Sequence, residues 1–278
     1  MKKLLENLLL EQDIFKPPTE EELEQRRKEF EQREIEKFVK EYNGKLSSDG
    51  SYDFDRSFDK DDLKLVIKNG RFLIKFGRVK GGFNCHSNKL TSLEGAPKYV
   101  EGDFNCSDNG LTSLEGAPKY VGGSFICSYN NLTSLEGAPE RVEGYFECAF
   151  NKLTSLEGAP ERVEGYFDCS DNKLTSLEGA PEYVGGSFDC SRNRLTSLEG
   201  APERVEKDFY CSDNNLTSLE GAPERVEGGF YCSNNKLTSL KGAPKYVGGD
   251  FTCRRNQKKF TEEEVRRVSE VKGKIVVV

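Results

Sequence analysis

Nine cysteines stand at a constant interval along this chain of 278 residues. They run from Cys85 to Cys253, and each step is 21 residues with no insertion or deletion. Eight of the ten prolines, from Pro97 to Pro244, follow the same step. A fixed period of about 20 to 50 residues predicts stacked repeats, as in a solenoid, a propeller or an array. This period constrains the fold more than any other feature of the sequence.

Each repeat reads Val-x-Gly-x-Phe-x-Cys-Ser-x-Asn-x-Leu-Thr-Ser-Leu-Glu-Gly-Ala-Pro-x-x, and eight full copies run from Val79 to Tyr246 before a ninth fades after Asn256. Phe and Cys lie on the same side of a short strand, because side chains alternate across a strand. Stacking places equivalent residues in ladders about 4.8 Å apart. One coil buries too few apolar side chains to offset the ordering of its backbone, so only the stack is stable.

The segment Phe104-x-Cys106-x-x-Asn109-x-Leu111-x-x-Leu114 matches the leucine-rich-repeat pattern L-x-L-x-x-N-x-L-x-x-L. The chain resembles short-repeat bacterial leucine-rich-repeat proteins, including effectors of Gram-negative pathogens. It resembles more closely a set of 21-residue Leu-Thr-Ser-Leu-Glu-Gly-Ala-Pro proteins encoded by bacteriophages and bacterial mobile elements. The resemblance covers about two-thirds of the chain. It implies a β-rich solenoid with short parallel strands on the concave face and an extended convex face.

Four segments are expected along the chain. They are a helical arm over 1–43, a β-hairpin cap over 44–78, a solenoid of about nine coils over 79–257, and a C-terminal helix-strand cap over 258–278. Caps are expected because the terminal coils of a solenoid would otherwise expose their apolar faces.

Local signals give the elements of the two ends. In the arm, a leucine-rich helix from about Lys2 to Glu11 precedes a second helix, which starts after the capping box Thr19–Glu22 and ends near Tyr42. Asn69-Gly70 suits the type I′ turn of a hairpin.

At the other end, Thr261-Glu262-Glu263-Glu264 caps a short helix that we expect to reach about Val271. A terminal strand over 274–278 should follow it. Its apolar edge either packs against the solenoid or forms an association site.

The cysteines behave as small buried hydrophobes in this arrangement. A metal site needs ligands that converge on a point, whereas these lie along a line, without a histidine partner. An odd count would leave one thiol over in a disulfide scheme. We therefore expect free thiols, no metal and no other cofactor. A reduced ladder predicts a cytoplasmic location, in the host cytoplasm if the chain is phage-encoded.

Charge and motif content argue against several functions. A formal net charge of −7 disfavours nucleic-acid binding. No apolar run approaches the roughly 18 to 20 residues of a membrane span, and the first ten residues lack a signal-peptide core. The one histidine, His86, has no evident nucleophilic partner, and the paired carboxylates recur instead of forming a single pocket. We expect a non-enzymatic protein that binds neither nucleic acid nor membrane.

The columns that vary between coils flank Phe and Cys and continue beside Asn. They hold acidic and aromatic residues with a basic border, which predicts a protein-binding strip on the concave face, since clustered aromatics dominate binding energy. The predicted contacts are Ile126, Tyr129, Tyr145, Phe150, Tyr166, Asp168, Asp171, Asp189, Arg192, Tyr210, Asp213 and Tyr231.

The predicted function is therefore that of a solenoid that grips a protein with a basic or mixed surface, a host factor if the phage resemblance holds. Three alternatives stay open. The aromatics could merely stack to stiffen the strip, the helical arm could drive oligomerisation or attachment, or the aspartates could bind a cation. The oligomeric state is left open.

Overall fold

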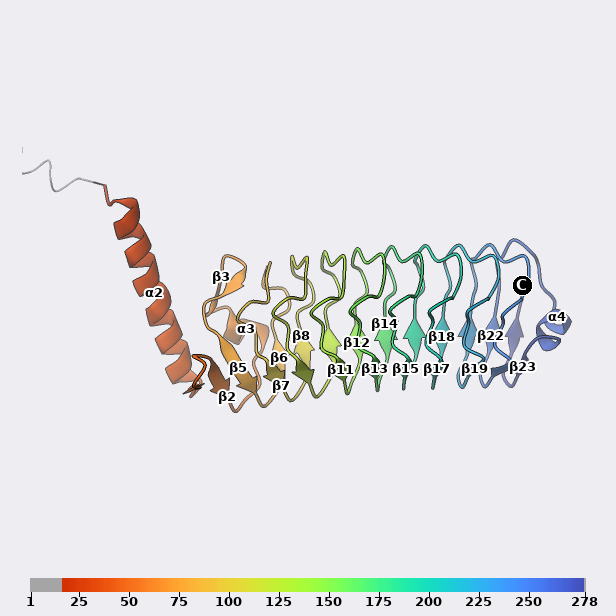
Figure 1. The fold of residues 1–278 in the computed structure, drawn as a ribbon, viewed down its shortest axis with the longest axis horizontal. Coiled ribbons are helices and arrows are strands. Elements are labelled where there is room, and N and C mark those ends of the chain that lie inside the picture. Colours follow the sequence, from red (N-terminus) through yellow and green to blue (C-terminus); the bar gives the residue numbers. More distant parts are fainter. Residues whose placement is uncertain (1–16, 278) are drawn as a thin grey trace, which may run out of the picture.

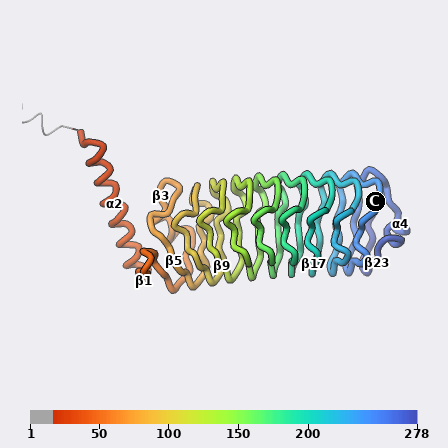
Figure 2. The backbone as a smooth tube through the Cα atoms, viewed as in Figure 1, coloured from red at the N-terminus to blue at the C-terminus, as the bar shows by residue number. Residues whose placement is uncertain are grey.

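The computed structural model describes residues 17–277, which form a stack of coils preceded by a projecting helix (Figure 1). Two parallel sheets run along the stack, because each coil contributes one short strand to each of them. Figure 2 shows the same backbone path repeated from coil to coil. The predicted leucine-rich-repeat solenoid of short parallel strands is confirmed.

We call the 12-stranded sheet, whose strands carry the repeated Val, sheet A. In spatial order it contains β1 (Lys45–Leu46), β2 (Tyr52–Phe54), β5 (Phe76–Val79), β7 (Tyr99–Val100), β9 (Tyr120–Val121), β11 (Arg141–Val142), β13 (Arg162–Val163), β15 (Tyr183–Val184), β17 (Arg204–Val205), β19 (Arg225–Val226), β21 (Tyr246–Val247) and β23 (Glu270–Val271).

We call the ten-stranded sheet, whose strands carry the repeated Phe, sheet B. In chain order it contains β6 (Phe83–Asn84), β8 (Phe104–Asn105), β10 (Phe125–Ile126), β12 (Phe146–Glu147), β14 (Phe167–Asp168), β16 (Phe188–Asp189), β18 (Phe209–Tyr210), β20 (Phe230–Tyr231), β22 (Phe251–Thr252) and β24 (Ile275–Val276).

The core is a set of columns that run along the stack. The repeated Val, Phe, Cys and both Leu residues are buried in every full coil. From Phe104 to Phe230 the rings of neighbouring coils stack with centroids 5.3 to 5.5 Å apart. Such pairs add about 0.5–1.5 kcal/mol beyond their area burial. Each coil is therefore held mainly by its two neighbours.

Sheet A is the main addition to the sequence-based picture, which placed its outward residues on an extended, soluble face without predicting that they pair. From Arg78 to Tyr246 its outward column holds either Arg or Tyr. Where the residue two positions after the Arg is Glu, the two form an ion pair, as in Arg162 Nε–Glu164 Oε1 at 2.6 Å. The same Arg-Val-Glu pairing occurs from Arg141, Arg204 and Arg225. Arg78 is followed two positions later by Lys80 and pairs instead with Glu101 of the next coil.

Three tyrosines of the same column are followed two positions later by Gly instead, at Tyr120, Tyr183 and Tyr246. In the first two of these coils the tyrosine side chain lies close to that glycine. A Cβ on Gly122 would be 3.3 Å from Tyr120 Oη, and one on Gly185 would be 3.3 Å from Tyr183 Cε1. The outer face of sheet A thus has two local solutions, an ion pair or a ring over glycine.

The N-terminal end of the stack is closed by aromatic packing. Phe54 of β2 pairs with Val79, and Phe58 bridges to Phe83, so both take the places of repeat residues. Phe38, which is buried, stacks on Phe58 at 5.5 Å.

Phe38 belongs to α2 (Glu20–Glu41), which begins with the expected Thr19–Glu22 capping box. α3 (Lys60–Leu63) and the antiparallel pair β3 (Ile67–Lys68) and β4 (Arg71–Phe72) follow. Asn69 and Gly70 join the last two strands with positive φ. The helix expected over 2–11 lies outside the described residues.

The C-terminal helix is shorter than expected. α4 spans Glu262–Arg266 and does not reach Val271. The reason is that Glu270–Val271 pairs with β21 in sheet A, while Ile275–Val276 pairs with β22 in sheet B. The end is therefore one more incomplete coil with a helical turn inserted. Among residues 17–277, no helix combines the length and apolarity needed to cross a membrane.

Candidate functional site

The twelve predicted contact residues lie in the strands of sheet B, directly before them, or in the loop that follows them, and we call this surface the strip. Seven flank a buried Phe of sheet B and point outward, since side chains alternate along a strand. They are Ile126, Tyr145, Tyr166, Asp168, Asp189, Tyr210 and Tyr231. The other five precede the repeated Asn and are Tyr129, Phe150, Asp171, Arg192 and Asp213.

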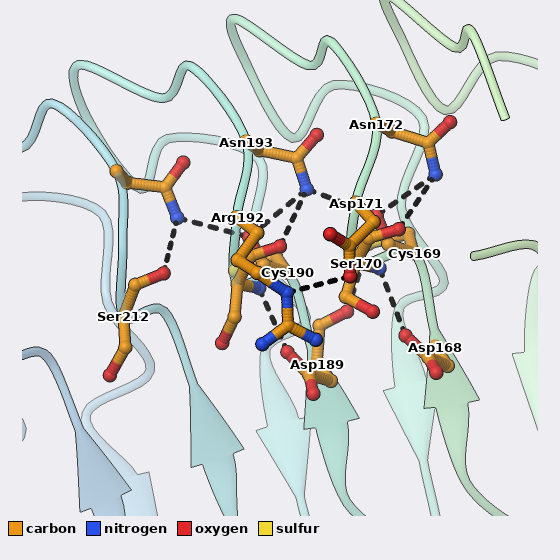
Figure 3. Close-up of polar contacts among 12 residues, drawn as sticks. Asp168, Cys169, Ser170, Asp171, Asn172, Asp189, Cys190, Arg192, Asn193 and Ser212 are labelled. Carbon is orange, nitrogen blue, oxygen red and sulfur yellow. Dashed lines mark hydrogen bonds and ion pairs between the residues drawn. The ribbon is translucent and has the colours of Figure 1, made fainter. Parts of the chain in front are cut away.

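The repeated asparagines fix the loop that borders the strip (Figure 3). Asn172 Nδ2 donates to the Cys148 carbonyl of the preceding coil at 3.0 Å and to the Cys169 carbonyl of its own coil at 3.2 Å. Its Oδ1 accepts the N–H of Leu153 at 3.0 Å. The same pattern recurs along the stack, so each asparagine ties one loop to the coil before it.

The residue before each of these asparagines has a left-handed backbone. Its φ lies between 51° and 58° in all nine coils. Left-handed geometry is unfavourable by about 1–2 kcal/mol for most residues, whereas Asn and Asp tolerate it. Tyr129, Phe150 and Arg192 are not of the tolerant kind. The hydrogen bonds of the following asparagine, to its own coil and to the preceding coil, fix this backbone conformation. The bulky side chains therefore point outward.

Tyr129 and Phe150 form a stacked pair with ring centroids 4.3 Å apart and planes 8° from parallel. They stay 56% and 41% exposed. Tyr145 is 53% exposed and lies on a backbone glycine, since a Cβ on Gly165 would be 2.5 Å from its Cδ1. The aromatic residues therefore stack against one another and also present open faces, so both interpretations of the cluster have support.

The other aromatics of the strip are more covered. Tyr210 and Tyr231 stack at 4.7 Å and are half-buried. The Tyr166 hydroxyl donates to Asp189 Oδ2 at 3.3 Å, and the Tyr210 hydroxyl donates to Asp208 Oδ2 at 3.0 Å. These phenols are anchored to neighbouring carboxylates, unlike Tyr129 and Tyr145.

Three carboxylates stand side by side in the column after Phe. Glu147 pairs in register with Asp168, and Asp168 with Asp189. Burial raises the pKa of Glu147, and the Asp168 carboxylate adds to the effect. Burial also raises the pKa of Asp168, although bonds from Ser170 oppose the shift. Sequence reasoning left Glu147 out of the predicted contacts, and its register with the two predicted aspartates is the signal that could have found it.

Some of the acidic side chains of the strip also stabilise the fold. The Ser170 and Ser191 N–H groups donate to Oδ1 of Asp168 and Asp189 at 2.9 and 2.8 Å, which closes the turn after each strand. Arg192 Nε donates to Asp171 Oδ2 of the preceding coil at 2.7 Å (Figure 3). Asp213 is exposed at the same position two coils after Asp171.

The described residues offer little for metal or acid–base chemistry. No group of three or more His, Cys, Asp or Glu side chains among residues 17–277 is placed to hold a metal ion. The nine cysteines are free and buried, and burial raises the pKa of Cys106 to about 12. His86 Nδ1 lies 2.7 Å from Asn84 Oδ1 of the same coil. Burial likewise raises the pKa of the other thiols from Cys85 to Cys232, whereas the hydrogen bond with Cys232 lowers the pKa of Cys253. All nine thiols are core residues.

Comparison with known proteins rests on structure. No family model matches the sequence, and no curated protein sequence does. Among solved structures, YopM from Yersinia enterocolitica WA-314, a leucine-rich-repeat protein, superposes with a TM-score of 0.52 and 25% identity over 63% of this chain. The chain spans 38% of the length of that YopM chain.

Leucine-rich-repeat solenoids are typically non-enzymatic scaffolds that bind proteins, so the fold points to an interaction role. The constant 21-residue repeat, the parallel strand of each coil and the likeness to YopM agree with one another. Together they fit a leucine-rich-repeat protein of the bacterial type.

Proposed function

We propose that this protein is a non-catalytic solenoid that grips a protein partner through the strip, and that the partner presents a basic surface there. The observation that carries the proposal is the row of in-register carboxylates Glu147, Asp168 and Asp189 beside outward-facing aromatic rings. The bacteriophage resemblance favours a host protein as the partner, and buried free thiols suit a reducing cytoplasm.

The carboxylate row is unfavourable in the isolated protein. Like charges placed directly opposite each other on neighbouring strands destabilise a sheet. Removal from water disfavours the charged form further, which is why the pKa of Glu147 and of Asp168 is raised. The positive charge of an arginine or lysine from a partner would compensate for both effects. Complementary charge of this kind sets specificity and speeds association.

The aromatic residues supply the remaining binding energy in this proposal. Interface energy concentrates in a few large side chains, with Tyr among the most frequent. Tyr129 and Phe150 present one continuous flat surface, and Tyr145 lies in the same coil as Phe150. Their positions are held by the asparagine bonds and by Gly165, so little conformational entropy is lost on binding.

The test is affinity capture with the wild-type protein and with a Tyr145→Ala, Phe150→Ala double variant, read by mass spectrometry. We expect the double variant to lose the captured partner with little change in melting temperature, because both rings are exposed. Tyr183→Ala, on sheet A, is the matched control and should retain capture. Sharply reduced stability with unchanged capture would show instead that the rings only stiffen the strip.

A second function is favoured by the exposed side chains Leu23 and Phe30 of α2, which leads away from the stack in Figure 1. In this alternative the arm drives oligomerisation or attachment. Because Phe38 of the same helix is buried against the stack, deletion of the arm would open the core. Light scattering should therefore compare the full chain with a Leu23→Glu, Phe30→Glu variant. An oligomer that this variant loses would favour assembly, and a monomer in both cases would favour the binder.

A further inference from the structure

The tyrosines on the outer face of sheet A differ in whether an arginine covers the ring. The Arg162 guanidinium lies 3.8 Å from the ring centroid of Tyr183, in the next coil. The Arg225 guanidinium lies 3.8 Å from the centroid of Tyr246 in the same way. A cation at this distance over an aromatic face is a favourable contact. The arginine of the preceding coil thus covers one face of each of these two rings.

Tyr99 and Tyr120 break this rule. The residue that precedes Tyr120 in the column is Tyr99, and the one that precedes Tyr99 is Arg78. Arg78 turns instead to Glu101, with Nε donating to Oε1 at 2.9 Å. Within residues 17–277 no cation and no second ring covers either tyrosine, and they are 50% and 43% exposed. Two neighbouring aromatic faces are therefore open at one place in an otherwise repetitive array.

These two rings line a cleft at the N-terminal end of sheet A. The loop between β1 and β2 forms its wall and is fastened by Asp49, whose Oδ2 accepts from Lys98 Nζ at 2.6 Å and whose carbonyl accepts from Lys75 Nζ at 3.1 Å. The cavity measures about 920 Å³. This volume falls in the range of small-molecule sites, about 300–1,000 Å³. Its lining includes Ser47, Asp49, Arg78, Lys98, Tyr99 and Tyr120.

Four of the five charged side chains that line the cleft form ion pairs. Asp49 is paired with Lys98, and Arg78 with Glu101. The carboxylate of Asp53 accepts from the Ser47 hydroxyl at 2.8 Å and from the Arg78 N–H at 2.7 Å. The surface therefore presents donors and acceptors around two flat rings, and Asp53 is the one charged lining residue held by hydrogen bonds instead of an ion pair. An anion would be repelled by Asp53, whereas a neutral molecule with many hydroxyl groups matches these donors and acceptors.

We propose that this cleft binds an uncharged carbohydrate. One face of a pyranose ring carries mainly C–H groups and would stack on Tyr99 or Tyr120, while its hydroxyls would bond to the charged and serine side chains of the wall. The site lies on sheet A, whereas the strip lies on sheet B, so the inference does not rest on the proposed protein partner.

The repeat itself supplies the sharpest variant. Tyr99→Arg creates Arg-Val-Glu at 99–101, a tripeptide that four other coils already contain, at 141–143, 162–164, 204–206 and 225–227. The new arginine would precede Tyr120 as Arg162 precedes Tyr183, and should close its ring without loss of fold. Tyr120→Ala is a second variant that removes the platform, and Tyr183→Ala is the matched control on the same face.

The experiment is saturation-transfer NMR and calorimetry on the full chain with three neutral trisaccharides: maltotriose, cellotriose and tri-N-acetylchitotriose. We expect at least one to bind the wild-type protein, with affinity lowered at least about tenfold in Tyr99→Arg and Tyr120→Ala and unchanged in Tyr183→Ala. A thermal melt of each variant confirms folding.

Absence of binding by all three sugars, or equal binding by the folded Tyr99→Arg variant, would overturn the proposal. A tri-arginine peptide serves as the charged comparator. If it binds at this cleft and the sugars do not, the ligand class is wrong.

Discussion

Replacing Asn172 by alanine tests whether the asparagine bonds hold the coils together. The buried N–H of Leu153 would lose its partner, Asn172 Oδ1. The carbonyls of Cys148 and Cys169 would each lose one donor, although Asn151 and Asn193 still bond to them. An unsatisfied buried group costs about 1–3 kcal/mol and each of the two lost bonds about 0.5–1.5 kcal/mol, so we expect a loss of about 2–6 kcal/mol in the free energy of unfolding.

The matched control is Asn256→Ala at the end of the stack. Its Oδ1 accepts from Leu237 at 3.3 Å in a half-buried setting, so water can replace part of what is lost. We expect about 1–2 kcal/mol there. Urea unfolding followed by far-ultraviolet circular dichroism measures both variants, and the slope of the transition shows whether the stack still unfolds as one unit. Equal losses at the two positions would refute the argument that the interior bonds link neighbouring coils.

Three further predictions follow from the burial, pKa and backbone of single residues. Glu147→Gln should raise the melting temperature at neutral pH and leave it unchanged near pH 3. Because the pKa of Glu147 is raised on folding, stability falls as pH rises through the folded pKa, and the uncharged variant avoids that loss. An equal difference in melting temperature at both pH values would contradict this reasoning. The nine buried thiols should resist a thiol reagent such as dithionitrobenzoate in the native state and all react in denaturant without reductant, and fewer would indicate disulfides. Arg255→Asn, at a φ of 54°, should add about 1 kcal/mol to stability in urea, and a loss would show that the left-handed column carries no strain.

The constant interval of the cysteines was enough to predict the solenoid, its strand and its buried columns, because every coil repeats the same side-chain alternation. The second sheet was not predicted, since Tyr-Val and Arg-Val pairs are too short to give a strand pattern by themselves and pair only after stacking. The predicted C-terminal helix is longer than the observed one for a similar reason. Nothing local shows that Val271 must enter sheet A beside Val247.

The strip residues could be chosen as the columns that vary, but their roles differ in ways that depend on three-dimensional contacts. Asp168 and Asp189 close turns, and Asp171 is paired with Arg192 in the next coil. The burial of Glu147 depends on the side chains of neighbouring coils, and the sequence alone does not show how closely those side chains pack. The predicted contact set remains a prediction until partner capture is measured.

The identical joint between neighbouring coils has a consequence for the gene. Removal of 163–183 would join Arg162 to Val184, the same Arg-Val step that Arg162 now makes with Val163, and every ladder would close in register. Unequal recombination between the coding copies therefore deletes or duplicates whole coils without disturbing either cap. We expect the lengths of homologous chains to differ in steps of 21 residues, so that selection can lengthen or shorten the strip while leaving its pitch unchanged.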